Sequence, residues 1–108
     1  MIVETIEYVP GYVIVETLGI VSGTIVNSKH VGRDIAAAFK TLAGGEIKGY
    51  TELLTESRNI ALKRMIDAAE KLGADAIIGV RFGSSSVLQS ATELFVYGTA
   101  VRLKKSEE

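Results

Sequence analysis

A glycine pair at Gly44 and Gly45 opens a long amphipathic helical pattern that runs almost directly into an apolar strand. From residue 46 to residue 72, apolar side chains recur at intervals of three, four or seven, and charged side chains follow the opposite line. Gly73 suits a left-handed helix cap, and residues 76–82 (AIIGVRF) then have the composition of a buried strand. A helix followed closely by a strand restricts the chain to folds that pack helices on a sheet.

The remaining segments supply the other elements of that fold. Residues 12–26 (YVIVETLGIVSGTIV) predict one long strand, in which Gly19 and Gly23 mark a bulge, a bend or a close approach of another backbone. Residues 35–42 predict a short alanine-rich helix, residues 83–91 a polar loop, and residues 92–104 a last strand. We therefore expect a single α+β domain over residues 1–108, with helices on one face of a three-stranded sheet.

Composition narrows the classes of protein that the chain can represent. Twelve basic and 13 acidic residues are scattered and give a net charge of −1, which argues against a nucleic-acid-binding surface. The absence of cysteine removes disulfides and thiolate sites. The amino-terminal residues lack the pattern of a secretory signal, and no apolar run approaches the roughly 20 residues of a membrane span. These features predict a cytoplasmic protein without a membrane partner.

The strands are apolar on both faces, and this pattern predicts self-association. In residues 92–104 both alternating sets of side chains stay apolar until Arg102. A small sheet covered by helices on one face would leave its second face in water and its long edges unpaired. On the long helix, Leu53, Ile60 and Ile66 also lie off the main apolar line. We expect other copies of the chain to cover these surfaces.

Arg58 is the most unusual residue of the long helix, because its position projects close to the apolar line between Leu54 and Ala61. A half-buried guanidinium needs a partner, which could be the carboxylate of Asp34 or Glu46, or carbonyl groups of another subunit. Two interpretations stay open at this point. Arg58 forms a structural ion pair or subunit contact, or it binds an anion.

Two further sets of residues could carry chemistry. His30 and Asp34 are four residues apart and could offer two ligands to a divalent metal, although Asp34 also suits a helix N-cap and His30 a surface position. Gly44 and Gly45 precede a helix N-terminus, where free amides could bind phosphate, or they simply form a turn. With one histidine in the chain, a serine triad is not expected. The carboxylates of the long helix are expected in solvent.

Several short motifs together resemble the YbjQ-like family of small bacterial and archaeal proteins, which carry the label "putative heavy-metal-binding domain" and whose function is unknown. The motifs are PGY at residues 10–12, GIVSG at 19–23, GGEIKGY at 44–50, LGADAIIGVRF at 72–82 and YGTAV at 97–101, with Arg58 and Ala61 between them. The resemblance covers nearly the whole chain. It implies an α+β subunit that assembles into a ring, a homopentamer.

The resemblance leaves two hypotheses for function. The first is a non-catalytic, ring-forming cytoplasmic protein that binds a metal ion or a small molecule. The second is an enzyme with a site at subunit interfaces, formed by Arg58, Glu46 and Tyr50 of neighbouring chains. The matching residues Gly44, Gly45, Glu46, Tyr50 and Arg58 fit either an interface or a pocket. Without cysteine, a metal would need carboxylates, or ligands pooled across subunits.

Overall fold

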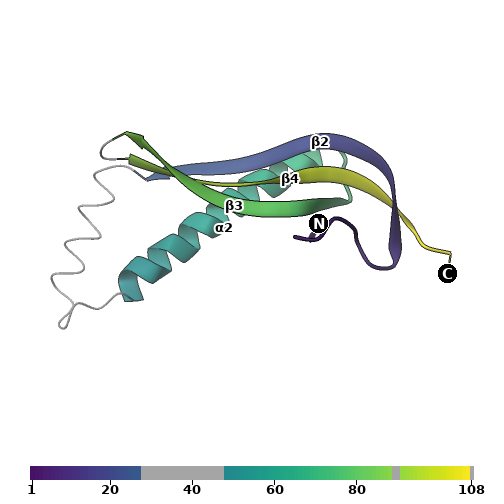
Figure 1. Cartoon of the computed structure of the whole chain (residues 1–108), viewed down its shortest axis with the longest axis horizontal. Helices are drawn as coiled ribbons and strands as arrows, with labels where there is room; N and C mark the ends of the chain where they lie inside the picture. Colours follow the sequence, from purple (N-terminus) through teal and green to yellow (C-terminus); the bar gives the residue numbers. More distant parts are fainter. Residues whose placement is uncertain (28–47, 89–90, 108) are drawn as a thin grey trace.

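The computed structural model describes residues 1–27, 48–88 and 91–107 and shows an α+β fold (Figure 1). One helix packs on a four-stranded mixed sheet with the strand order β1-β3-β4-β2. The elements are β1 (Ile2–Val3), β2 (Tyr12–Asn27), α2 (Lys48–Lys71), β3 (Ala76–Leu88) and β4 (Ala91–Lys105). The predicted order of long strand, long helix and two strands is confirmed. The short helix predicted at residues 35–42 lies outside the described residues.

The sheet is antiparallel except at one corner. Strand β4 lies between β2 and β3 and runs antiparallel to both, whereas β1 runs parallel to the start of β3. The sequence did not predict β1, whose two residues pair with Ala76 and Ile77. The predicted loop at residues 83–91 is wrong, because β3 continues to Leu88. Its serines pair with β4 and remain exposed, as polar residues do on solvated antiparallel strands.

Helix α2 ends where the sequence predicts, and its cap has the hydrogen bonds of a Schellman motif. Gly73 has a φ of 77°, and its amide donates to the carbonyl of Glu70 at 3.0 Å. The amide of Ala74 donates to the carbonyl of Ala69 at 3.1 Å. This cap turns the chain back toward the sheet, so that β3 begins three residues later at Ala76.

The buried line of α2 overlaps the predicted line at Ala61 and Met65. Ser57, Ala61, Met65 and Ala69 are buried at intervals of four, whereas Leu72, which the sequence also places on the apolar line, follows the end of the helix and is 44% exposed. The small side chains on the buried line permit a close approach of α2 to β2. The main core forms between these layers, from Val21, Ala61, Met65, Ala69, Ile77, Val80, Val96 and Ala100.

Three glycines shape the strands, and for Gly19 and Gly23 the sequence predicted such a role. Gly19 has a φ of 115° at a register shift in β2, and Gly79 has a φ of 62° at a register shift in β3. Both sites are bulges that bend the long strands. Gly23 lies directly under α2, where a Cβ would overlap the carbonyl oxygen of Ala61. The close approach of two backbones predicted for Gly19 or Gly23 is therefore confirmed at Gly23.

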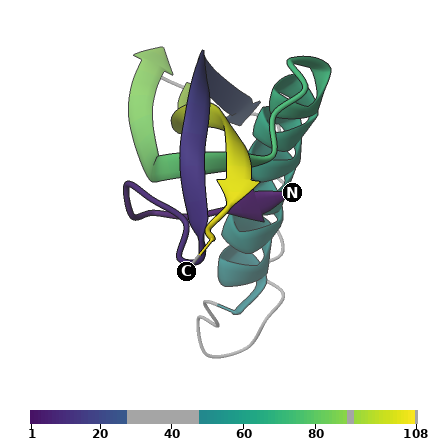
Figure 2. The same ribbon diagram turned by 90° about the vertical axis from the view of Figure 1, so that its right-hand side faces the viewer.

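The amino-terminal segment covers part of the sheet face opposite α2 (Figure 2). Val9, which is 4% exposed, packs there in a second core cluster with Ala76, Ile78 and Val101. Arg81 fixes the segment by donating from Nη1 to the carbonyl oxygen of Thr5 at 2.7 Å. Only the end of the sheet near β1 is covered in this way.

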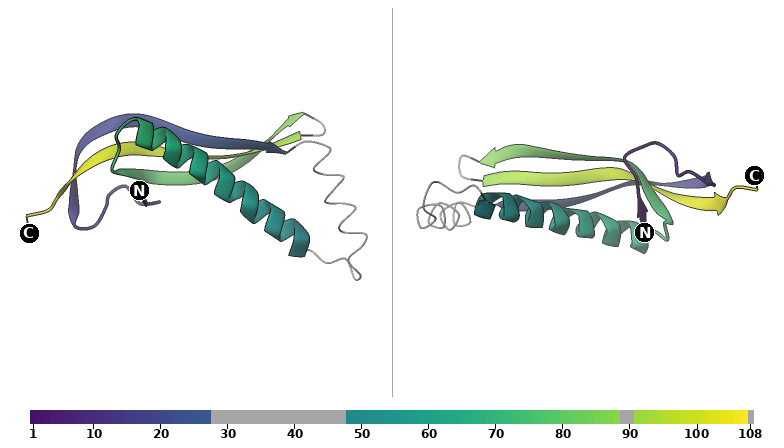
Figure 3. Two further views of the ribbon diagram at one scale, coloured as in Figure 1. Left: turned by 180° about the vertical axis from the view of Figure 1, so that it is seen from behind. Right: turned by 90° about the horizontal axis from the view of Figure 1, so that it is seen from below.

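The molecule is elongated. It measures 57 × 27 × 18 Å with a radius of gyration of 17.5 Å, against about 13 Å for a compact chain of 100 residues. The amino-terminal end of α2 diverges from the sheet, and at the other end β2 and β4 extend beyond the helix (Figure 3). In the described part of the chain no helix has the length and apolar character needed to cross a membrane. The fold thus leaves much of its apolar surface uncovered.

Candidate functional site

Most residues predicted to bind a ligand lie outside the described part of the chain. This group comprises His30, Asp34, Gly44, Gly45 and Glu46. Tyr50 lies in the first turn of α2, where the structure describes the backbone and not the side chain. Arg58 is the one predicted site residue whose side chain is described. The predicted metal ligands, phosphate-binding turn and interface enzyme therefore stay predictions.

Arg58 is exposed in the single chain, so the expectation of a half-buried guanidinium is corrected. Its Nη2 donates a hydrogen bond to Oγ1 of Thr55 at 3.2 Å, and the Thr55 hydroxyl donates to the carbonyl of Thr51 at 2.9 Å. Ser57, not Arg58, is the buried residue at this level of the helix, and the amino-terminal part of α2 diverges from the sheet (Figure 3). The residue thus extends from the surface of the helix, where a subunit contact or an anion could reach it.

The described residues do not provide a metal centre. They contain no group of three His, Cys, Asp or Glu side chains that could hold an ion. Glu52 and Glu56 are exposed on α2, which confirms the prediction that they lie in solvent. Since thiolates are absent from the whole sequence, the described residues do not fit a heavy metal, which prefers soft ligands.

The most unusual surface of the described structure is the uncovered part of the sheet opposite α2. We call it the open face and define it by Ile20, Val26, Phe95 and Tyr97. Cross-strand register places these side chains on the same face: Ile20 is opposite Thr99 and Val26 opposite Glu93, while Phe95 and Tyr97 occupy alternate positions of β4. Ile20 is 82% exposed, Val26 54% and Tyr97 43%. The amino-terminal segment, which packs on the far end of the sheet, leaves these side chains in solvent.

The aromatic pair gives the open face a defined shape. The rings of Phe95 and Tyr97 are stacked, with centroids 6.1 Å apart and an angle of 27° between their planes. Phe95 extends over Gly83 of β3, where the missing side chain leaves room for the ring. Aromatic pairs of this geometry contribute about 0.5–1.5 kcal/mol beyond the area that they bury.

Polar groups around the open face are already engaged with the chain itself. The guanidinium of Arg81, which is opposite Tyr97, donates to the carbonyl oxygens of Thr5 and Val80. Ser85 donates to the carboxylate of Glu93 at 3.2 Å. No described histidine or cysteine stands near these groups, so the face has the chemistry of an apolar contact surface rather than of a catalytic site.

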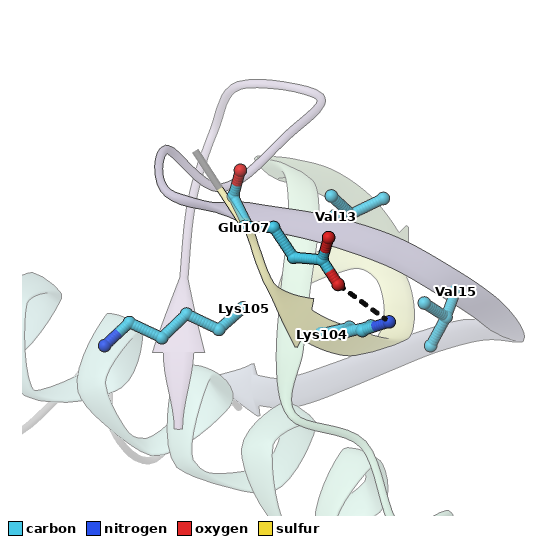
Figure 4. A pocket seen from close by; sticks show the side chains of 6 residues that line it. Val13, Val15, Lys104, Lys105 and Glu107 are labelled. Atoms are coloured by element: carbon cyan, nitrogen blue, oxygen red, sulfur yellow. Dashed lines mark ion pairs between the residues drawn. The ribbon is translucent and has the colours of Figure 1, made fainter.

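A shallow hollow of about 670 Å³ lies at the end of the sheet beyond α2, lined by Val13, Val15, Lys104, Lys105, Ser106 and Glu107 (Figure 4). Lys104 and Lys105 extend in opposite directions, so their ammonium groups do not converge on one point. Nζ of Lys104 lies 3.9 Å from a carboxylate oxygen of Glu107. The hollow therefore does not form a site for an anion.

The fold and this surface define a class: a small α+β subunit with an apolar sheet face and without an assembled catalytic or metal constellation in its described residues. A family model described as "Putative heavy-metal-binding" matches residues 1–104. The chain belongs to this family, the YbjQ-like proteins, as its sequence motifs indicate.

Relatives match the sequence of this chain over nearly their whole length. The chain is similar to a UPF0145 protein of Fervidobacterium nodosum, with 79% identity covering 100% of both chains. A UPF0145 protein of Thermotoga maritima is 68% identical over 97% of this chain and 99% of its own. The fold is similar to that of a protein of unknown function of the DUF74 family from Pediococcus pentosaceus. That structure gives a TM-score of 0.63 at 20% identity, over 96% of this chain and 98% of the other.

The sequence predicted that an uncovered apolar face exists, but not which residues form it. Two-sided apolarity of the strands predicted an uncovered face, yet nothing marked Ile20 as its most exposed member. The signal that could have identified Ile20 is the register of β2 after Gly19. Ile20 follows the bulge at Gly19, and only the position of that bulge decides whether Ile20 points toward α2 or away from it.

Proposed function

We propose that this protein is a non-catalytic subunit of a closed homo-oligomeric ring, which acts in the cytoplasm as a binding or scaffolding assembly for a metal ion or a small molecule. The observation that carries the proposal is the open face, above all the 82% exposure of Ile20. A scattered exposed apolar side chain is ordinary, but apolar and aromatic side chains gathered on one sheet face, here with Ser22 and Thr24 between Ile20 and Val26, support an interaction surface. The ring size expected from the family resemblance is five.

The shape of the subunit supports the same proposal. A chain of this length that remains elongated has a smaller core than a compact domain, and it gains stability by burying surface against other copies. Complete burial of one isoleucine side chain is worth about 1.5–3 kcal/mol. Because a ring repeats the contact in each subunit, even a few such residues stabilise the assembly strongly.

Replacing Ile20 with lysine is expected to dissociate the ring. The substitution removes an apolar contact and places a charge in a surface that must lose water, so both effects act against assembly. Native mass spectrometry should show the wild-type protein as a multiple of the 11.5 kDa subunit and Ile20→Lys mainly as the subunit. The same spectrum of protein purified from its own host reports any retained metal or metabolite.

The matched control is Asn59→Lys, which adds the same charge at an exposed position of α2 away from the open face. This variant should keep the wild-type subunit number. Circular dichroism must show that both variants are folded. A wild-type protein that is monomeric at micromolar concentration would refute the ring, and an Ile20→Lys protein that still assembles would remove the open face from the interface.

A further inference from the structure

We propose that the ring is held by a parallel pairing between β2 of one subunit and the distal half of β3, residues 81–88, of the next. This inference rests on the proposed ring and identifies the segments that join its subunits. It concerns the backbone edges of the sheet, whereas the argument for the ring rests on the open face.

Both segments have a free edge in the described structure. Strand β2 pairs with β4 and with no other described strand, although it is 16 residues long. Strand β3 has a neighbour on its outer side only near its start, where β1 pairs with Ala76 and Ile77. The amino-terminal segment extends this contact through hydrogen bonds of the Gly79 and Val80 amides. Beyond Val80 no described backbone group pairs with the outer edge of β3.

These edges have few of the features that keep exposed strands apart. Proteins protect long edge strands with lysine, proline, inward-pointing charges or bulges. The bulges of β2 lie between Ile14 and Gly19, before residues 20–27, which carry the proposed contact. Strand β2 contains neither lysine nor proline, and Glu16 is its one charged residue. In residues 81–88 the one charged residue is Arg81, whose guanidinium is bound to the amino-terminal segment. Two long unprotected edges in a soluble chain indicate that both are paired in the assembly.

The two edges lie at the same level of the sheet and run in the same direction. Ser22 and Arg81 flank Tyr97 on opposite sides of β4, and Asn27 and Ser86 likewise flank Thr92. Since β2 and β3 are both antiparallel to β4, they are parallel to each other.

Rotation about a ring axis that runs along the strands preserves strand direction, so the β2 edge of one copy meets the β3 edge of the next in parallel. A two-fold axis would instead pair β2 with β2 in antiparallel fashion. The two free edges differ from each other, and such head-to-tail contacts generate rings when the rotation closes. The pairing also gives Ile20 and Val26, which stand on an edge strand, new cross-strand neighbours on the next subunit. The open faces of successive subunits become continuous.

The absence of cysteine allows a direct test by disulfide crosslinking in the full chain. Ser85→Cys is combined in turn with Ser22→Cys, Thr24→Cys and Val26→Cys. All four positions are on the same face, and the three pairs sample registers two residues apart. Adjacent strands bring Cα atoms within the 4.4–6.8 Å that a disulfide requires. One pair should give a ladder of covalent oligomers after mild oxidation, ending at the subunit number found by native mass spectrometry.

The single-cysteine variants are the controls and should give no ladder. Disulfide-linked dimers of Val26→Cys alone would show two-fold pairing of β2 with β2 and would overturn the proposal. An intact ring without a ladder for any of the three pairs would overturn the pairing but not the ring. Wild-type protein that is monomeric before oxidation would instead refute the ring itself, so the two failures are distinguishable.

Discussion

Replacing Gly23 with alanine is expected to lower the free energy of unfolding by about 3 kcal/mol. The added Cβ would overlap the carbonyl oxygen of Ala61 and lie 2.7 Å from the amide nitrogen of Met65. Both are backbone atoms of α2, so no side-chain rotation relieves the contact. The helix must move away from β2, which loosens the core around Met65. At an unobstructed strand position, replacing glycine with alanine tends to stabilise the protein. A loss of stability in Gly23→Ala would therefore point to the contact with α2.

Gly83→Ala is the matched control, because its Cβ is also obstructed, but by a side chain. The obstructing atoms belong to the ring of Phe95, with the nearest at 2.5 Å. That ring is at the open face and can turn aside, so we expect a loss of about 1 kcal/mol or less. Urea unfolding followed by circular dichroism, at one fixed protein concentration, measures both losses. Equal losses would contradict the backbone contact between β2 and α2.

The long elements were predictable because each has a strong local signal. Strand β2 is rich in β-branched residues, α2 repeats its apolar positions over many turns, and Gly73 supplies the cap. The burial of Ser57 was not predictable from hydrophobicity alone. The size of the residues matters as well, because the small residues Ala61 and Gly23 let the backbones of α2 and β2 approach each other closely.

The strand segments that the sequence did not predict depend on pairing with other strands. Strand β1 has two residues, and it exists because the outer edge of β3 offers hydrogen bonds to Ile2 and Val3. The serines of β3 have low strand propensity, yet they pair with β4 across a hairpin. Neither feature leaves a periodic pattern in its own segment. The first depends on pairing between segments far apart in the sequence, and the second on the neighbouring strand of the hairpin.

The sequence predicted that the candidate site is an uncovered apolar face, but it did not predict which residues form that face. Apolar residues on both sides of β4 required a second covered face, and the structure shows which side chains lack that cover. Sequence reasoning instead emphasised Arg58, because its position projects close to the apolar line of the helix, yet its side chain is exposed. The exposure of Arg58 depends on how α2 packs on the sheet, and that of Ile20 depends on the bulge at Gly19.

Replacing Met65 with alanine is the second change with a large expected effect, a loss of about 2–5 kcal/mol in the free energy of unfolding. Met65 is fully buried and is among the largest side chains of the core between α2 and the sheet. Truncation leaves a cavity that the sheet, held by paired strands, cannot collapse to fill. In a domain whose total stability is on the order of 5–15 kcal/mol, such a loss populates unfolded chains near the growth temperature.

Leu72→Ala is the matched control for Met65→Ala. Both residues lie on the apolar line that the sequence predicts for the helix, but Leu72 is 44% exposed, whereas Met65 is not exposed at all. Leucine and alanine have similar helix propensities, so the loss at Leu72 should stay near 1 kcal/mol. Thermal and urea unfolding at matched concentrations measure the difference. Equal losses at Leu72 and Met65 would contradict the packing of α2 on the sheet through Met65, with Leu72 left largely in solvent.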